Sequence, residues 1–113
     1  MKQTNVVLTE AVFYTLLALH KPLHGYGIMQ ETEQMSNGRL KLSAGTLYGA
    51  LSSLLEKGWI AELPIEKGSR KKEYEVTKLG KEIASLELQR LEELVNNGKS
   101  IINKISSNEK NNF

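Results

Sequence analysis

Cations and hydroxyl groups in the middle of the chain are the side chains best suited to bind a ligand. Residues 34–81 include nine basic and five acidic residues, whereas the rest of the chain is net acidic. Four of the cations fall close together: Lys67, Arg70, Lys71 and Lys72. Such flexible cations can bind phosphates or place an arginine in the minor groove of DNA. The alternative is a solvated basic edge that keeps strands from pairing between molecules.

A run of small and hydroxyl-bearing residues precedes these cations. Ser43 is expected to cap a helix that reaches Lys57 and buries a leucine face. The opposite face then predicts DNA contacts, because small side chains enter the major groove and hydroxyls donate to phosphates or base edges. No acidic residue lies between Gln34 and Leu55. The predicted contacts are Ser43, Ala44, Thr46, Tyr48, Gly49 and Ser52, unless this face is an ordinary small-residue surface.

Residues for catalysis or metal binding are missing from the sequence. There is no cysteine, which excludes disulfides and thiolate metal sites and favours a cytoplasmic location. His20 and His24 flank Pro22 and are expected to have turn or surface roles. No apolar run is long enough to span a membrane, and the first residues do not resemble a signal peptide. We therefore expect neither an enzyme nor a bound cofactor.

The hydrophobic periodicity predicts the elements that hold these groups. Three helices are expected: from Thr9 to Pro22, over 26–35 and over 43–57. A hairpin follows, with strands 59–65 and 70–77 around a turn at 67–69. A last helix starts at Thr77 or Lys78. This order predicts a mainly α fold with a small β-hairpin: a winged helix-turn-helix plus a long C-terminal dimerisation helix. The expected divisions are residues 1–77 for DNA binding, 78–107 for dimerisation and 108–113 as a frayed tail.

The last helix carries an apolar stripe too long for the preceding residues to cover. A second copy of the chain is the simplest partner, and a twofold homodimer would place two recognition helices about 34–36 Å apart on one side of DNA. The alternative is that the helix folds back onto its own domain, and Gly98 is a point where it could kink or break. The predicted dimerisation residues are Leu86, Leu91, Leu94, Val95, Ile101, Ile102 and Ile105.

Several short motifs, in their order and spacing, resemble the PadR family of regulators over about residues 6–105. They are Leu8-Thr9-Glu10-Ala11, His24-Gly25-Tyr26-Gly27, Thr46-Leu47-Tyr48, Leu55-Glu56-Lys57-Gly58-Trp59-Ile60, Arg70-Lys71-Lys72-Glu73-Tyr74 and Val76-Thr77-Lys78-Leu79-Gly80. The resemblance is to the compact branch with a single terminal helix. It implies a dimeric repressor on a palindromic operator, with Thr46 and Tyr48 beside the DNA and a basic wing on phosphate or minor groove.

The resemblance also implies a small aromatic effector, because some compact members bind flat aromatic compounds between subunits through a tryptophan on the terminal helix. This chain departs there: its only tryptophan is Trp59, and the terminal helix has Leu88 and Leu91 instead. The favoured hypothesis is a DNA-binding transcriptional regulator. The alternatives are a protein-interaction module that assembles without DNA and a small-molecule binding protein with incidental DNA affinity.

Overall fold

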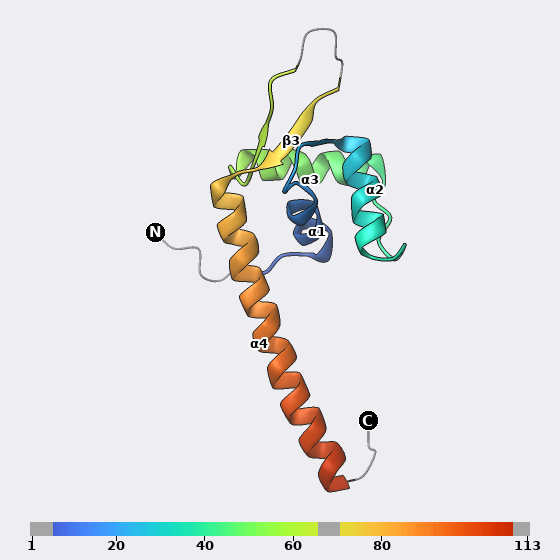
Figure 1. Cartoon of the computed structure of the whole chain (residues 1–113), viewed down its shortest axis with the longest axis vertical. Helices are drawn as coiled ribbons and strands as arrows, with labels where there is room; N and C mark the ends of the chain where they lie inside the picture. The colour runs from blue at the N-terminus through green and yellow to red at the C-terminus, as the bar shows by residue number, and fades with distance from the viewer. Residues whose placement is uncertain (1–5, 66–70, 110–113) are drawn as a thin grey trace.

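The structure, a computed structural model, describes residues 6–65 and 71–109 (Figure 1). Over these residues it has four helices and a three-stranded antiparallel sheet, in the order α1 (Glu10–Ala18), β1 (Leu23–His24), α2 (Gly25–Met35), α3 (Ala44–Glu56), β2 (Ile60–Glu62), β3 (Glu73–Val76) and α4 (Lys78–Glu109). The predicted class, mainly α with a small β-hairpin, is confirmed. The predicted turn at 67–69 lies outside the described residues.

The first two helices begin at side chains that accept a backbone hydrogen bond. Thr9 caps α1 as predicted, accepting from the Val12 amide at 3.2 Å. α1 ends at Ala18, short of the Pro22 that was expected to stop it. His24 caps α2, since its Nδ1 accepts from the Gly27 amide at 3.2 Å. Histidine is an uncommon N-cap residue, so this cap could not be predicted from residue preferences.

The third helix matches its predicted start and its predicted buried face. The Ser43 hydroxyl accepts from the Thr46 amide at 3.2 Å and caps α3. Leu47, Leu51 and Leu54 are buried in the common core. After the helix, Gly58 adopts a left-handed φ of 76°, which turns the chain into the sheet.

The sheet contains one more strand than expected, and the strand order is β1-β3-β2. β1 pairs Leu23 with Tyr74, and β2 pairs Ile60 with Val76. β2 and β3 are shorter than the predicted strands 59–65 and 70–77. β1 was not predicted because two residues are too few to show an alternating pattern.

α4 is continuous through Gly98, so the break considered there does not occur. The helix runs to Glu109, two residues beyond the predicted end at 107, and residues 110–113 of the predicted tail lie outside the described residues. Its first half packs on the core through Ile83, while its second half extends beyond the rest of the described chain (Figure 1). No helix among the described residues is long and apolar enough to cross a membrane.

One carboxylate is buried where α4 meets the N-terminal segment. The Glu87 side chain is 2% exposed and accepts two hydrogen bonds from Arg90, at 2.8 and 2.7 Å. It also accepts from the Leu8 amide at 3.4 Å. The paired Arg90 is the main cause that lowers the pKa of Glu87, against the opposing effect of burial. The negative charge of the Glu87 carboxylate is therefore balanced by Arg90, and the same carboxylate links the segment before α1 to α4.

The start of α4 lies against the residues that join α3 to β2. The Thr77 hydroxyl donates to the Gly58 carbonyl at 2.7 Å and accepts from the Gly80 amide at 3.1 Å. A Cβ at Gly80 would lie 2.7 Å from Cγ2 of Val76 and closer still to the Trp59 carbonyl oxygen. Only glycine permits this approach, because the obstacle includes backbone.

Gly80→Ala is expected to destabilise the fold by about 1–3 kcal/mol, because the added methyl overpacks α4 against the backbone of Trp59. Gly49→Ala is the matched control: a Cβ there has no atom within 4 Å, so helix propensity should raise stability by up to about 1 kcal/mol. Thermal and urea unfolding measure both. A Gly80→Ala protein as stable as the control would contradict the close approach.

Candidate nucleic-acid interface

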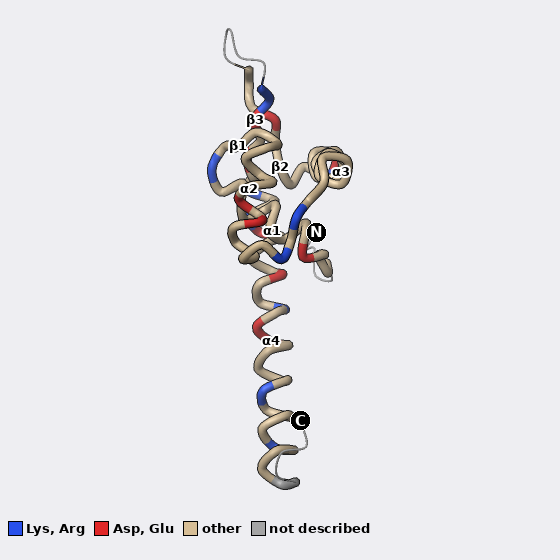
Figure 2. The backbone as a smooth tube through the Cα atoms, turned by 90° about the vertical axis from the view of Figure 1, so that its right-hand side faces the viewer, with Lys and Arg blue, Asp and Glu red and all other residues tan. Residues whose placement is uncertain are grey.

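The outward face of α3 holds every helix residue that the sequence predicted to meet DNA. All six members are exposed, and Tyr48 is 51% exposed. They are Ser43, Ala44, Thr46, Tyr48, Gly49 and Ser52. α3 contains no lysine or arginine, and its one carboxylate, Glu56, lies at its last residue (Figure 2). This face can therefore approach a polyanion without a repelling charge along its length.

The wing is defined here as residues 60–76, and its described strands, β2 and β3, lie at the same end of the molecule as α3 (Figure 1). Lys71 and Lys72 are exposed immediately before β3. Nζ of Lys72 lies 3.8 Å from a carboxylate oxygen of Glu62 on β2. This separation and the exposure of both groups make it a weak surface pair. Lys67 and Arg70, also predicted to bind DNA, lie outside the described residues.

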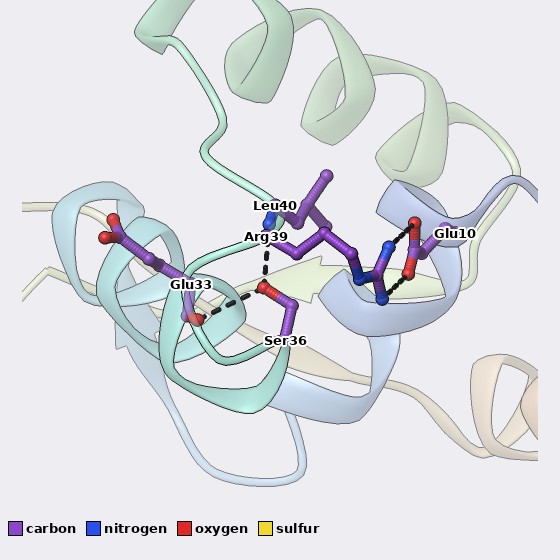
Figure 3. Close-up of polar contacts among 5 residues, drawn as sticks. All are labelled: Glu10, Glu33, Ser36, Arg39 and Leu40. Carbon is purple, nitrogen blue, oxygen red and sulfur yellow. Dashed lines mark hydrogen bonds and ion pairs between the residues drawn. The ribbon is translucent and has the colours of Figure 1, made fainter.

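The turn between α2 and α3 is held by hydrogen bonds of the Ser36 side chain (Figure 3). Asn37 and Gly38 adopt left-handed φ values of 55° and 81°. The buried Ser36 hydroxyl donates to the Glu33 carbonyl at 3.1 Å and accepts from the Leu40 amide at 2.8 Å. The Ser36 hydroxyl thus gives the Leu40 amide the acceptor that a continuing helix would have supplied.

Arg39 ties this turn to the start of α1. Its guanidinium donates to both carboxylate oxygens of Glu10, one of these bonds being 2.8 Å long (Figure 3). The hydrogen bond from Arg39 lowers the pKa of Glu10. Because this pKa is lowered, the pair stabilises the folded state fully above the ordinary pKa of glutamate, and this stabilisation is lost as the pH falls through the lowered pKa of Glu10. Sequence reasoning missed this pair because its members are 29 positions apart.

Trp59 belongs to the core and not to an open surface. It is 8% exposed, and the Lys57 ammonium lies 4.9 Å from the centre of its ring. Its ring is therefore largely removed from the surface of the chain.

The predicted dimerisation residues form an uncovered apolar surface in this single chain. Five are exposed and two, Leu91 and Ile105, are half-buried. The exposed ones are Leu86, Leu94, Val95, Ile101 and Ile102. An apolar stripe of this length on a charged helix is unusual for a monomer.

The family model of the PadR-like transcriptional regulators matches residues 14–85, which include α2, α3, the wing and the start of α4. The chain belongs to the PadR-like family. Members of this family are DNA-binding transcriptional regulators and not enzymes.

Solved structures of similar fold support the winged-helix architecture of this PadR-like protein. A PadR family regulator from Eggerthella lenta superposes with a TM-score of 0.65 at 20% identity, covering 80% of this chain and 76% of the other. A regulator from Clostridium thermocellum gives 0.62 at 24% identity, covering 83% and 89%. A PadR family regulator from Clostridium difficile gives 0.59 at 23% identity, covering 88% and 97%.

A curated relative shares sequence with part of the PadR-like chain. It is an uncharacterized 37.1 kDa protein of a Streptomyces fradiae transposon, 39% identical over 66 residues. The match covers 58% of this chain but only 18% of the relative, so the chain spans less than a fifth of that protein.

Ser36→Ala is expected to destabilise this regulator by about 1–3 kcal/mol, because the partly buried Leu40 amide loses its acceptor. Ser53→Ala on the exposed surface of α3 serves as the control and should be neutral or slightly stabilising. Chemical unfolding gives the energies, and hydrogen exchange at Leu40 reports the turn directly. If the two variants had equal stability and equal hydrogen exchange at Leu40, Ser36 would have no structural role in the turn.

Proposed function

We propose that this PadR-like regulator is a repressor that binds a palindromic operator as a homodimer. The observation that carries the proposal is the exposed, hydroxyl-rich face of α3 beside the lysines of the wing. This face needs a partner that accepts hydrogen bonds and carries negative charge, and duplex DNA offers both in its major groove and backbone. A dimer bound at a promoter represses by excluding the transcription machinery.

In this proposal the outward face of α3 and the wing make different kinds of contact with DNA. α3 carries no cation, so we assign to it base-edge recognition by Thr46 and close approach by its small residues. The wing carries Lys71 and Lys72, and we assign it the phosphate contacts together with Lys67 and Arg70. Affinity should then depend on salt through the wing, and sequence preference on α3.

In this proposal α4 supplies the dimer interface, with residues 1–77 as the DNA-binding part and 78–107 as the dimerisation part. A second copy is the occupant that the apolar stripe favours, because a twofold axis lets one stripe cover its equivalent. It would also set two α3 helices at a fixed separation, which a palindromic site requires. An aromatic effector stays a prediction of the family resemblance.

Thr46→Ala is expected to reduce affinity for the preferred site about tenfold while leaving affinity for random duplex nearly unchanged, because it removes a base contact. The preferred site is first recovered by selection from a random DNA pool, and mobility shifts at two salt concentrations then give the affinities. Ser53→Ala, two turns further along α3, is the control.

Equal losses on the preferred site and random duplex would refute base reading by Thr46. Failure of the wild-type protein to bind any duplex in the presence of competitor would instead favour the protein-interaction module. In that case, a thermal shift with aromatic compounds would indicate a small-molecule binding protein.

Ile101→Glu is expected to weaken self-association at least tenfold, because it places a charge in the apolar stripe of α4. Asn103→Glu adds the same charge at an exposed position away from the stripe and is the matched control. Sedimentation velocity over a range of concentrations measures both. A wild-type protein that stays monomeric at micromolar concentration would overturn the homodimer.

A further inference from the structure

His24 lies at a junction of α2, α3 and the wing. It is the last residue of β1, which pairs with β3 of the wing, and it directly precedes α2. The next residue, Gly25, is buried, and a Cβ there would lie 2.8 Å from Cζ of Tyr48 on α3, so the end of the phenol ring rests on the glycine. The residues at the start of α2 therefore adjoin both α3 and the wing.

The hydrogen bond that His24 makes at this junction requires a neutral imidazole. Its Nδ1 accepts from the Gly27 amide at 3.2 Å, which satisfies one of the donors that the first turn of a helix leaves without a backbone partner. A neutral imidazole has one acceptor nitrogen, whereas both nitrogens of the protonated ring are donors. The protonated ring would also place a positive charge at the positive end of the helix dipole. Protonation therefore removes this cap of α2.

The charged groups around His24 act on its protonation in opposite directions. Glu73 is its partner across the β1–β3 pair and is exposed, so its carboxylate is an anion that a protonated ring can approach. Lys71 and Lys72 oppose a positive charge on the ring, because they line the same pocket of about 480 Å³ as His24. The remaining titratable groups of that pocket are the phenols of Tyr26, Tyr48 and Tyr74. A protonated His24 thus has Glu73 as an alternative partner outside the cap.

We infer that His24 is a pH-sensitive positioning residue, and that protonation of its imidazole lowers the affinity of this protein for DNA. Histidine is the side chain whose charge ordinarily changes between about pH 5 and pH 8. With the neutral ring, the cap holds the start of α2 against Tyr48 and beside the wing. With the charged ring, this turn loosens and the support of α3 weakens. The inference rests on the proposed function for its effect on DNA, whereas release of the cap can be measured without DNA.

Hydrogen exchange of single amides measures the cap directly in the wild-type protein. The Gly27 amide, capped by His24, and the Thr46 amide, capped by the Ser43 hydroxyl, both donate at 3.2 Å. Between about pH 8 and about pH 5.5, and after correction for intrinsic exchange rates, we expect Gly27 to lose about fivefold more protection than Thr46, because a hydroxyl does not titrate in this range. Equal changes at the two amides would overturn the inference.

Binding to the preferred DNA site at the same two pH values tests the consequence. His24→Asn keeps an N-cap acceptor that does not titrate. His20→Asn is the matched control, because it removes the other histidine of the chain, which is exposed. We expect acidification to lower affinity about fivefold in the wild type and in His20→Asn, and to leave His24→Asn nearly unchanged.

The direction of the pH effect separates cap release from simple electrostatics. A protonated histidine that only added positive charge near DNA would strengthen binding as the pH falls. An affinity that rises on acidification, or that falls equally in His24→Asn, would therefore overturn the role of His24 while leaving DNA binding intact. Absence of wild-type binding to any duplex at either pH would instead reject the proposed function, and with it the effect of His24 on DNA.

Discussion

Burial of one face of α3 is the constraint on which the arrangement depends. Leu47, Leu51 and Leu54 lie in the core with residues from the other helices and the sheet. Because a helix is rigid, removing these leucines from water also decides which residues face outward, and these are the small and hydroxylated ones. A carboxylate or a large side chain in the same outward positions would not alter the core, but it would oppose approach to a nucleic acid.

The wing is held beside α3 by backbone contacts at the C-terminal end of β3. The Thr77 amide donates to the Trp59 carbonyl at 3.0 Å, and the Val76 amide donates to the Leu19 carbonyl at 3.0 Å. These bonds join the end of β3 to the residue before β2 and to the residue that caps α1. The base of the wing is therefore attached to the core, and the backbone of Lys71 and Lys72, directly before β3, is positioned by it.

The chain belongs to the PadR-like family of transcriptional regulators, and under the proposed function two surfaces take part in DNA binding. The face of α3 offers hydroxyls without charge, whereas the wing offers charge with little capacity to distinguish bases. Under the proposed function, specificity and salt dependence can therefore be separated by mutation. The opposite end of the molecule, the distal half of α4, carries the apolar stripe, so dimerisation would not compete with DNA for the same residues.

Sequence alone determined what depends on near neighbours along the chain. The caps at Thr9 and Ser43, the leucine face of α3, the continuous stripe of α4 and the exposure of the α3 residues follow from helical periodicity and hydrogen bonding over a few residues. The tertiary structure decided what depends on packing between distant segments. β1, the Glu10–Arg39 pair and the seating of Tyr48 on Gly25 join residues that lie far apart in sequence. Their approach is set by how the helices and sheet pack together, and no local pattern records that geometry.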